Sequence, residues 1–390
     1  MIDGTRLTKT AIRWGMVGGG RGSQIGYVHR SAAMRDGYFD LRAGAFDLDP
    51  ERGRAFGVDL GLDPDRCYPD YQAMFAAESA RPDGIRCVTI ATPNNTHYPI
   101  TRAALLAGIH VICEKPLTFT TAEALDLQAI ARERGLVVGV AYGYSGHQMI
   151  EEAARLVADG TLGEIRIVTM QFAHGFHSAP VELDSPATRW RVDPAFAGPS
   201  YVLGDLATHP LYLAQVICPD LRIRRLLCTR QSFVASRAPL EDNATVLMEY
   251  DGGAVGTLWT SAVNAGSMHG QKVRVTGSKG SVEWWDEHPN QLRLEIQGEA
   301  ARLLDRGMPY LHAQSLGDDR IGAGHPEGLF EAWANLHSRF AQAIEAHEEG
   351  DPARAAHLRY PGIGAGVEGV RWVEHCVRSA DAGGVWVDYA

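Results

Sequence analysis

Residues 12–23 of the chain read IRWGMVGGGRGS, and they are the strongest indication of the fold class. An apolar run from Ile12 to Val17 has the composition of a buried strand, and glycines follow it at once. Such a turn, placed ahead of a helix, leaves backbone N–H groups open to bind a pyrophosphate. Ligand-free glycine turns are also common, and here Ser23 takes the third position of G-x-G-x-x-G, with Gly26 three residues further on. We therefore expect a longer turn with shifted phosphate contacts; its candidate cofactor-binding residues are Gly18, Gly20, Arg21, Gly22 and Ser23.

Short apolar runs alternate with helical stretches from residue 11 to about residue 145. This alternation is typical of βαβ units around a parallel sheet. One helix has clear boundaries, because Thr120 and Glu123 form a capping box and Gly135 follows its last turn. The strands are expected at 12–17, 41–46, 87–91, 110–113 and 137–141, and two of the helices at 98–107 and 122–134.

The pattern changes after residue 145, where helices and consecutive strands with short turns follow. Consecutive strands with tight turns indicate a mostly antiparallel sheet, so the second domain is of the α+β class. Helices are expected at 148–158, 205–217, 329–345 and 364–379, and residues 308–324 as an ordered loop. The strands are expected at 164–172, 223–233, 244–250, 254–261, 271–276, 281–285 and 291–296.

Asp47 ends the second expected strand, 21 residues after Gly26. A carboxylate there accepts hydrogen bonds from the adenosine ribose hydroxyls and repels a 2′-phosphate, which favours NAD over NADP. No arginine follows Asp47 directly to receive that phosphate. The alternative is that residues 47–50 only cap the next helix.

The tripeptide Glu114-Lys115-Pro116 follows the apolar strand 110–113, and the proline stops that strand. Lys115 therefore belongs at the carboxyl edge of the sheet, where open α/β sheets bind ligands. The segment 92–97, which reads TPNNTH, leaves the preceding strand at the same edge, although a plain turn would look similar. Its candidate cofactor-binding residues are Thr92, Asn94 and His97, together with Glu114 and Lys115.

Together, these motifs resemble the Gfo/Idh/MocA family of NAD(P)-dependent oxidoreductases, named after glucose-fructose oxidoreductase and inositol dehydrogenase. The resemblance covers nearly the whole chain. It rests on the glycine turn, on residues 91–97 and 111–117, and on Asp205-x-x-x-His209. It implies an NAD-binding Rossmann domain at 1–145, followed by an α+β domain at 146–390 with a large, mostly antiparallel open sheet for substrate binding and oligomerisation.

In that family the lysine of the Glu-Lys-Pro segment and the Asp and His of the later motif form the catalytic group. Here these are Lys115, Asp205 and His209. Four-residue spacing at a helix start puts Asp205 and His209 on one face. His209 could then take a hydroxyl proton while Lys115 stabilises the alkoxide, although which of the two is the formal base stays open. The alternatives are a helix N-cap for Asp205 and a structural histidine for His209.

Further residues are candidates for substrate binding. Trp190 and Arg191 resemble a stretch that reaches cofactor or substrate in some members, and Arg191 could hold a hydroxyl-rich or anionic ligand. Tyr144 and His325 resemble substrate-side positions in one branch of the family. A surface arginine, a structural tyrosine and a helix-capping turn are the respective alternatives.

Composition excludes several classes of function. The net charge is −10, with 37 Lys and Arg against 47 Asp and Glu and no basic block, so nucleic acid and anionic membranes are not expected partners. The six scattered cysteines indicate reduced thiols, and the sequence has neither a signal-like start nor a long apolar segment, which predicts a soluble cytoplasmic protein. Fifteen histidines include His174 and His177 near Glu182 and Asp184, but no compact metal motif, so no metal is expected.

The predicted function is NAD-dependent oxidation of a secondary hydroxyl of a sugar, glycoside or cyclic polyol such as an inositol to a ketone. One rival is a redox-neutral, NAD-dependent glycosidase or lyase that works through a transient keto-sugar. Another is a non-catalytic NAD-binding sensor. The family usually pairs its open sheets, so we expect a homodimer or homotetramer.

Overall fold

The computed structural model describes residues 2–389, apart from the side chains of Pro186, Ala187 and Ala356. The chain divides into two compact units. The parallel-sheet unit contains Asp3–Gly143 and Phe330–Glu368, and among the described residues the large-sheet unit contains Ile2, Tyr144–Leu329 and residues 369–389. The two units are interleaved in sequence, whereas the predicted domains, 1–145 and 146–390, are each continuous. The division into an NAD-binding domain and a substrate-binding domain at residue 145 stays a prediction.

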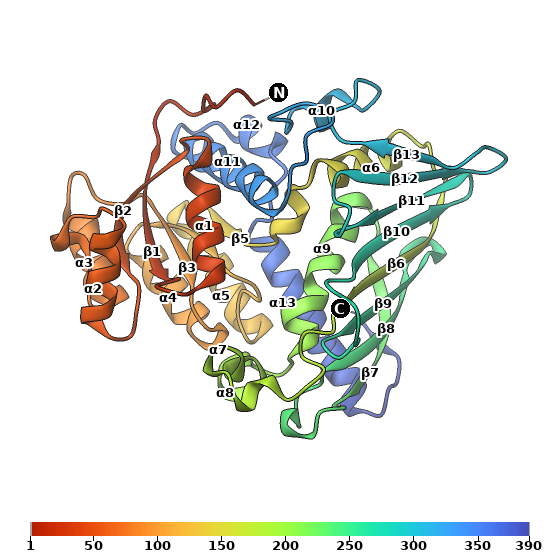
Figure 1. Cartoon of the computed structure of the whole chain (residues 1–390), viewed down its shortest axis with the longest axis horizontal. Coiled ribbons are helices and arrows are strands. Elements are labelled where there is room, and N and C mark those ends of the chain that lie inside the picture. The colour runs from red at the N-terminus through yellow and green to blue at the C-terminus, as the bar shows by residue number, and fades with distance from the viewer. Residues whose placement is uncertain (1, 390) are drawn as a thin grey trace. The chain divides into compact units, whose positions relative to one another are not determined.

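The parallel-sheet unit is built on five strands in the order β2-β1-β3-β4-β5, all parallel (Figure 1). β3 and β4 are completely buried, so their runs of apolar residues fit a sheet covered on both faces. This confirms the predicted α/β class. The strands are β1 (Ile12–Gly18), β2 (Phe39–Ala45), β3 (Cys87–Ala91), β4 (His110–Cys113) and β5 (Val138–Val140).

Helices connect these strands, and α5 has the predicted capping box: Thr120 accepts from the Glu123 N–H, and the Glu123 carboxylate accepts from the Thr120 N–H. The predicted C-terminal glycine is also confirmed, because Gly135 has a φ of 62°. The helices are α1 (Gln24–Arg35), α2 (Pro50–Asp59), α3 (Tyr71–Ala80), α4 (His97–Leu106) and α5 (Thr121–Arg134).

A late segment completes this unit. Helix α11 (Leu329–Glu348) contributes Leu336, Phe340 and Ile344 to the same core as Ile12 and Trp14. The backbone after α12 (Pro352–His357) also joins β5, since the Val140 N–H donates to the Pro361 carbonyl at 2.7 Å.

The large-sheet unit contains a nine-stranded sheet in the order β13-β12-β11-β10-β6-β9-β8-β7-β14 (Figure 1). All neighbouring pairs are antiparallel except β6 with β9, so the predicted mostly antiparallel sheet is confirmed. The short strands β13 and β14 were not expected. The bounds are β6 (Ile165–Ala173), β7 (Ile223–Gln231), β8 (Asn243–Tyr250), β9 (Val255–Ser261), β10 (Gln271–Gly277), β11 (Gly280–Trp285), β12 (Gln291–Ile296), β13 (Arg302–Asp305) and β14 (Val387–Asp388).

Side chains alternate across this sheet between a buried and an exposed face. Val168, Val246 and Leu258 belong to the buried core, which α6 (Gln148–Ala158), α9 (Thr208–Ile217) and the later part of α13 (Ile363–Asp381) cover. The exposed face carries apolar side chains at Ile167, Leu247, Val255 and Trp259.

Short helices occupy the polar stretch before α9: α7 (Pro186–Arg189) and α8 (Pro194–Ala197). The loop expected at 308–324 contains one helical turn, α10 (Ala313–Leu316), and is anchored by the buried Arg306, which donates to the Gly322 carbonyl at 2.8 Å and pairs with Asp319 and Glu327. The loop is therefore ordered, as predicted.

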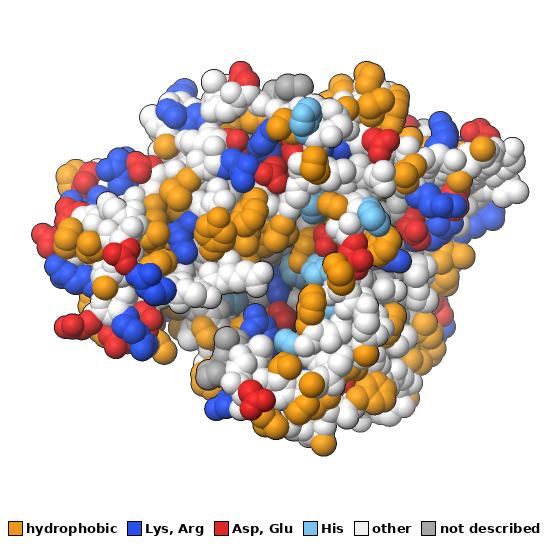
Figure 2. Space-filling model, viewed as in Figure 1, with side chains coloured by type: hydrophobic (Ala, Val, Ile, Leu, Met, Phe, Trp, Pro, Cys, Tyr) orange, Lys and Arg blue, Asp and Glu red, His pale blue; other side chains and the backbone are white. Residues whose placement is uncertain are grey.

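Charged side chains of both signs are interspersed over the face that Figure 2 displays. Within residues 2–389, none of the helices combines the length and apolar character that crossing a bilayer requires.

Candidate active site

The glycine turn follows β1 and lies between the ends of β2 and β3, the two strands that flank β1. Gly18 and Gly19 have φ values of 74° and 64°, in the left-handed region that favours glycine. A Cβ at Gly18 would come within 2.5 Å of the Ala91 carbonyl, and one at Gly20 within 2.5 Å of the Phe46 carbonyl. Backbone therefore closes around the turn on both sides, and only glycine fits there.

The departure of this turn from G-x-G-x-x-G has a structural reason. Ser23 is the N-cap of α1, and its hydroxyl accepts from the Gly26 N–H at 3.1 Å. A Cβ at Gly26 would overlap the backbone of Gly19. Gly26 therefore serves the close approach of helix and strand, while Ser23, in the usual glycine position, caps the helix.

The surroundings of the turn suit an anion. The first turn of α1 has no acidic residue, and the buried Arg30 guanidinium donates to the Gly19 carbonyl at 2.6 Å. Burial lowers the pKa of Arg30, but an arginine stays charged in proteins. Arg21 instead pairs with Asp59 and is largely exposed. A helix N-terminus with a buried cation behind it fits the pyrophosphate of a dinucleotide.

Asp47 is not the helix cap. Asp49 caps α2 by accepting from the N–H groups of Glu51 and Arg52, whereas Asp47 accepts from the Asp49 N–H at 2.9 Å. The Arg52 guanidinium also donates to Asp47 at 2.9 Å and lowers the pKa of that carboxyl group. Although no arginine follows Asp47 directly, Arg52, five residues later, reaches its carboxylate.

The main chain around Lys115 is held from one side by a buried histidine. Lys115 follows β4, and the Nδ1 of His97 lies 2.7 Å from the Pro116 carbonyl. The Nε2 of the same ring lies 2.9 Å from the Thr92 carbonyl, and burial lowers the pKa of His97. His97 is fully buried between the two loops, and in its neutral form it donates to one of these carbonyls; its contact with a cofactor stays a prediction.

The other predicted residues at this edge differ in exposure. Asn94 is buried in the turn that precedes α4, and the Thr92 hydroxyl accepts from Thr96 at 2.7 Å. Lys115 is half-buried. Glu114 is buried, and its Oε1 lies 2.9 Å from the Nε2 of His29, a residue that was not among the predicted ones.

Asp205 and His209 lie on one continuous helical segment of the large-sheet unit. Residues Leu203–Ala207 form a turn of π-helix that runs directly into α9. The Asp205 N–H donates to the Tyr201 carbonyl at 2.8 Å, so Asp205 lies inside the helical segment and is not its N-cap. Such π-turns are frequent at functional sites.

The surroundings of His209 are aromatic. The residue is buried, and its ring lies 4.9 Å from that of Tyr144 and 6.0 Å from that of Phe172. Tyr144 in turn contacts His269, with 3.2 Å between the hydroxyl and Nε2, and the His269 Nδ1 lies 2.7 Å from Asp286. The structure therefore brings the predicted residues Tyr144 and His209 together and adds His269 and Asp286.

Trp190 and Arg191 join the same part of the unit. The Arg191 guanidinium stacks on the Trp190 ring at 4.5 Å, and its Nε lies 3.5 Å from Asp205 Oδ2. His325 is different. Its side chain is exposed, and only its backbone carbonyl is engaged, by Arg306.

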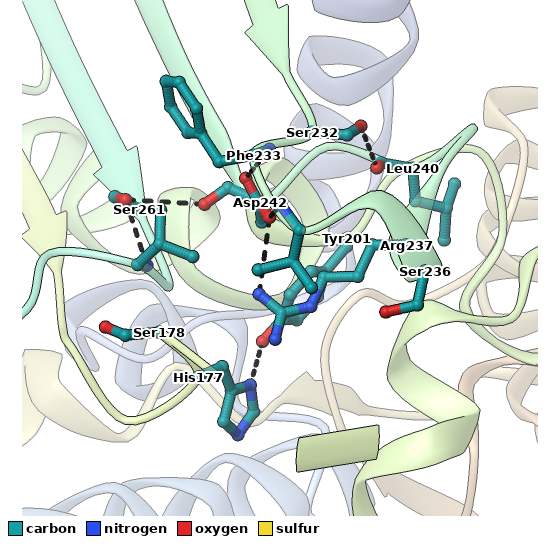
Figure 3. Close-up of polar contacts among 12 residues, drawn as sticks. His177, Ser178, Tyr201, Ser232, Phe233, Ser236, Arg237, Leu240, Asp242 and Ser261 are labelled. Atoms are coloured by element: carbon teal, nitrogen blue, oxygen red, sulfur yellow. Dashed lines mark hydrogen bonds and ion pairs between the residues drawn. The ribbon is translucent and has the colours of Figure 1, made fainter. Parts of the chain in front are cut away.

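A buried arginine lies near His177 and Tyr201. Arg237 is fully buried and pairs with Glu182 at 3.1 Å and Asp242 at 3.4 Å. Figure 3 shows the Arg237 guanidinium beside the His177 ring, which points to the Tyr201 hydroxyl. Burial and Arg237 lower the pKa of His177.

The residues that came nearest to a metal motif have other partners. His174 and His177 contact each other with ring centroids 5.4 Å apart, and burial lowers the pKa of His174 to about 4. Glu182, which shares that part of the sequence, binds Arg237 and Ser236 instead. No group of three or more His, Cys, Asp or Glu residues that could hold a metal ion occurs within residues 2–389.

Comparison with known proteins identifies the class. Residues 12–142 match the model of the oxidoreductase family's NAD-binding Rossmann fold, and residues 154–388 match that of its C-terminal alpha/beta domain. The chain therefore belongs to the Gfo/Idh/MocA family of oxidoreductases. The predicted family and the prediction of an NAD-dependent oxidoreductase are confirmed, as is NAD as the cofactor.

Individual relatives narrow the class. The chain is 68% identical to an inositol dehydrogenase homolog from Azotobacter vinelandii solved with NAD⁺, with a TM-score of 0.99 and full coverage of both chains. The structure of that homolog with NADH and myo-inositol has a TM-score of 0.96. The chain is also 56% identical to the uncharacterized oxidoreductase YfiI of Bacillus subtilis (strain 168), over the whole of both chains. The Azotobacter protein is thus named after inositol dehydrogenase, and the Bacillus protein is named as an oxidoreductase.

Proposed function

We propose that the protein is an NAD-dependent dehydrogenase that oxidises one secondary hydroxyl of a cyclic polyol of the inositol class to a ketone. The observation that carries this proposal is the buried His209, with Tyr144 against its ring and Asp205 on the same helical segment. Support for the substrate class comes from the Azotobacter homolog, whose structure was solved with myo-inositol. Sugars and glycosides are the wider set from which this class is chosen.

The glycine turn, Asp47, Thr92 and Asn94 are the residues that we propose to hold NAD. When bound, NAD supplies the acceptor for the hydride that leaves the hydroxyl-bearing carbon. The protein orients the substrate and provides a place for the hydroxyl proton. The buried Arg30 and the N-terminus of α1 supply the positive potential that an anionic cofactor requires.

The family resemblance assigns Lys115, Asp205 and His209 to one reaction. In this proposal the His209 imidazole accepts the hydroxyl proton, and the Lys115 ammonium stabilises the alkoxide that forms. Asp205 keeps the imidazole oriented and stabilises its protonated form. The Arg191 guanidinium pairs with the Asp205 carboxylate. We propose that Arg191, Trp190 and Tyr144 bind the polyol.

We further propose that the enzyme is a homodimer or homotetramer. The exposed apolar side chains of Ile167, Leu247, Val255 and Trp259 lie on one face of a sheet, and contiguous exposed apolar surface marks an interaction site. Light scattering of the purified protein measures the assembly directly.

We also propose that the protein works in a reducing compartment, since all six cysteines are buried free thiols.

The test of the function is an assay of the purified protein with NAD and a panel of inositols, free sugars and glycosides. NADH is followed by its absorbance, and products are identified in the same wells. We expect NADH formation with at least one inositol and the corresponding ketone as product. Cleavage of a glycoside without NADH would replace this proposal with the redox-neutral one. NAD binding without turnover across the panel would favour the sensor.

A further inference from the structure

A chain of buried polar groups lies behind Lys115, and the proposed function does not use it. The Glu114 carboxylate lies 2.9 Å from His29 Nε2, and the other nitrogen of that ring lies 3.3 Å from His337 Nε2. The chain ends where His337 Nδ1 meets the Trp333 carbonyl at 2.9 Å. It therefore connects α1 and α11 with the end of β4, all within the parallel-sheet unit.

The positions of the protons can be worked out from the Trp333 end of this series. The Trp333 carbonyl can only accept a hydrogen bond, so His337 Nδ1 carries a hydrogen. Burial and the neighbouring His29 lower the pKa of His337 to about 3, so its Nε2 is unprotonated and accepts from His29 Nδ1. One proton must then lie between His29 Nε2 and Glu114. The pair is either imidazolium with carboxylate or imidazole with carboxylic acid, and its net charge is zero in both cases.

The surroundings of these groups are buried and aromatic. His29 and His337 are 0% and 1% exposed. The Trp333 ring lies 4.8 Å from that of His29, and the rings of Phe39 and Phe340 lie 5.7 Å and 6.1 Å from that of His337. Removing one partner here would leave a buried polar group without a hydrogen bond. The hydrogen bonds of this series therefore depend on one another.

The chain ends at the main chain of the predicted catalytic residue. Glu114 Oε2 accepts from the Lys115 N–H at 3.3 Å, while the Pro116 carbonyl on the other side binds His97. Lys115 thus lies between two residues that are each held by a buried histidine. We propose that His29, supported by His337, is a positioning residue: through the proton that it shares with Glu114, it fixes the backbone from which the Lys115 side chain acts.

This inference deepens the proposed function and rests on it only for the role of Lys115. The bland alternative is that the two histidines fill space between α1 and α11. Glu114→Gln separates the two interpretations, because the new amide N–H₂ can donate to His29 Nε2 while its carbonyl accepts from the Lys115 N–H. Glu114→Gln therefore preserves every hydrogen bond in this series of buried groups. Glu114→Met and His29→Leu keep the side-chain volume but remove the hydrogen bond between positions 29 and 114.

The experiment compares these variants in the full-length protein by two measurements. The first is hydrogen exchange of the Lys115 amide, which needs no substrate. The second is kcat with the best polyol, together with KM for NAD. We expect His29→Leu and Glu114→Met to exchange faster at Lys115 and to lose about tenfold or more in kcat, with KM for NAD within about threefold. Glu114→Gln should keep the wild-type exchange rate at Lys115 and retain more kcat than Glu114→Met, and the double variant should be no worse than the worse single variant.

The matched control is His110→Leu. His110 is a buried histidine at the other end of the same strand β4, where its Nδ1 accepts from the Val137 N–H at 2.9 Å. Its loss should lower thermal stability without changing Lys115 exchange or kcat. Wild-type exchange in His29→Leu, or a Glu114→Gln as impaired as Glu114→Met, would overturn the inference. If wild-type protein oxidises no polyol, the proposed function fails, and the exchange data still decide whether the chain holds Lys115.

Discussion

The Arg191 Nε lies 3.5 Å from the Asp205 Oδ2, and both side chains are partly exposed. This ion pair joins a residue predicted to bind substrate with one predicted to be catalytic. We expect Arg191→Ala to lower kcat/KM for the polyol about tenfold or more, because Asp205 loses its cationic partner and the substrate loses a donor, while NAD affinity stays unchanged. Steady-state kinetics and a direct NAD titration measure both.

Arg189→Ala is the control for that loop. Its guanidinium donates to the carbonyls of Glu182 and Leu183 and does not reach Asp205. An equal loss in Arg189→Ala would mean that loop structure, and not the pair with Asp205, sets activity.

Lys115→Ala and His209→Ala should each lose turnover by about a hundredfold or more, because each removes a group that handles the hydroxyl proton or the alkoxide. NAD binding should persist in both. Single-turnover kinetics and NAD titration provide the measurement. Lys272→Ala, which removes a lysine that stacks on Trp285 in the large sheet, is the control. Full activity in either catalytic variant would refute the site.

The pair of Asp47 and Arg52 predicts how cofactor preference changes. Asp47→Ser removes the carboxylate that would repel a 2′-phosphate and releases a guanidinium that can bind one. We expect the ratio of kcat/KM for NADP to that for NAD to rise about tenfold or more. Asp49→Ser removes a charge two residues away and still caps α2, so its ratio should barely move. An unchanged ratio in Asp47→Ser would place the ribose elsewhere.

The contact between Gly26 and Gly19 predicts a steric effect on cofactor binding. A methyl group in Gly26→Ala overlaps the Gly19 backbone and must displace the turn. NAD affinity, measured by calorimetry, should fall about tenfold or more. Gly364→Ala is the control, since a Cβ there meets nothing within 4 Å, and that variant should bind NAD normally. Normal binding by Gly26→Ala would show that the phosphates do not depend on this turn.

Buried neutral histidines predict a loss of stability in acid. Burial lowers the pKa of His110 to about 3 from 6.5, so between these values the unfolded chain holds a proton that the folded chain lacks. Stability therefore falls as the pH drops through this window, by up to ~1.4 kcal/mol per pH unit for each such group. His337, with a pKa of about 3, adds to the effect.

Urea unfolding at a series of pH values measures this slope. His110→Leu should flatten it relative to the wild type, because one of the contributing groups is gone. A slope that the variant leaves unchanged would assign the acid sensitivity to other residues.

The sequence predicted what depends on local order. The capping box at Thr120 and Glu123 and the strands of both sheets other than β13 and β14 follow from spacing and periodicity, and the structure confirms them. Lys115 was placed at the end of a strand by the proline that follows it, and it lies there.

The remaining site contacts depend on distant residues. His29 meets a residue 308 positions away, and neither end of that pair carries a local signal beyond a histidine within a helix. The π-turn at Asp205 has no sequence signature, so a plain helix was expected there. His269 was likewise invisible, because its contact with Tyr144 spans 125 positions.

The late return of α11 to the parallel sheet has a consequence for how the protein is made. Phe340 and Ile344 cover a core that the first 143 residues begin, so this core stays open until the ribosome has added the whole large-sheet segment. A shortened gene that stops near residue 145 should therefore yield an aggregating fragment. Joining residues 330–368 directly behind it would be the shortest route to a self-sufficient dinucleotide-binding module.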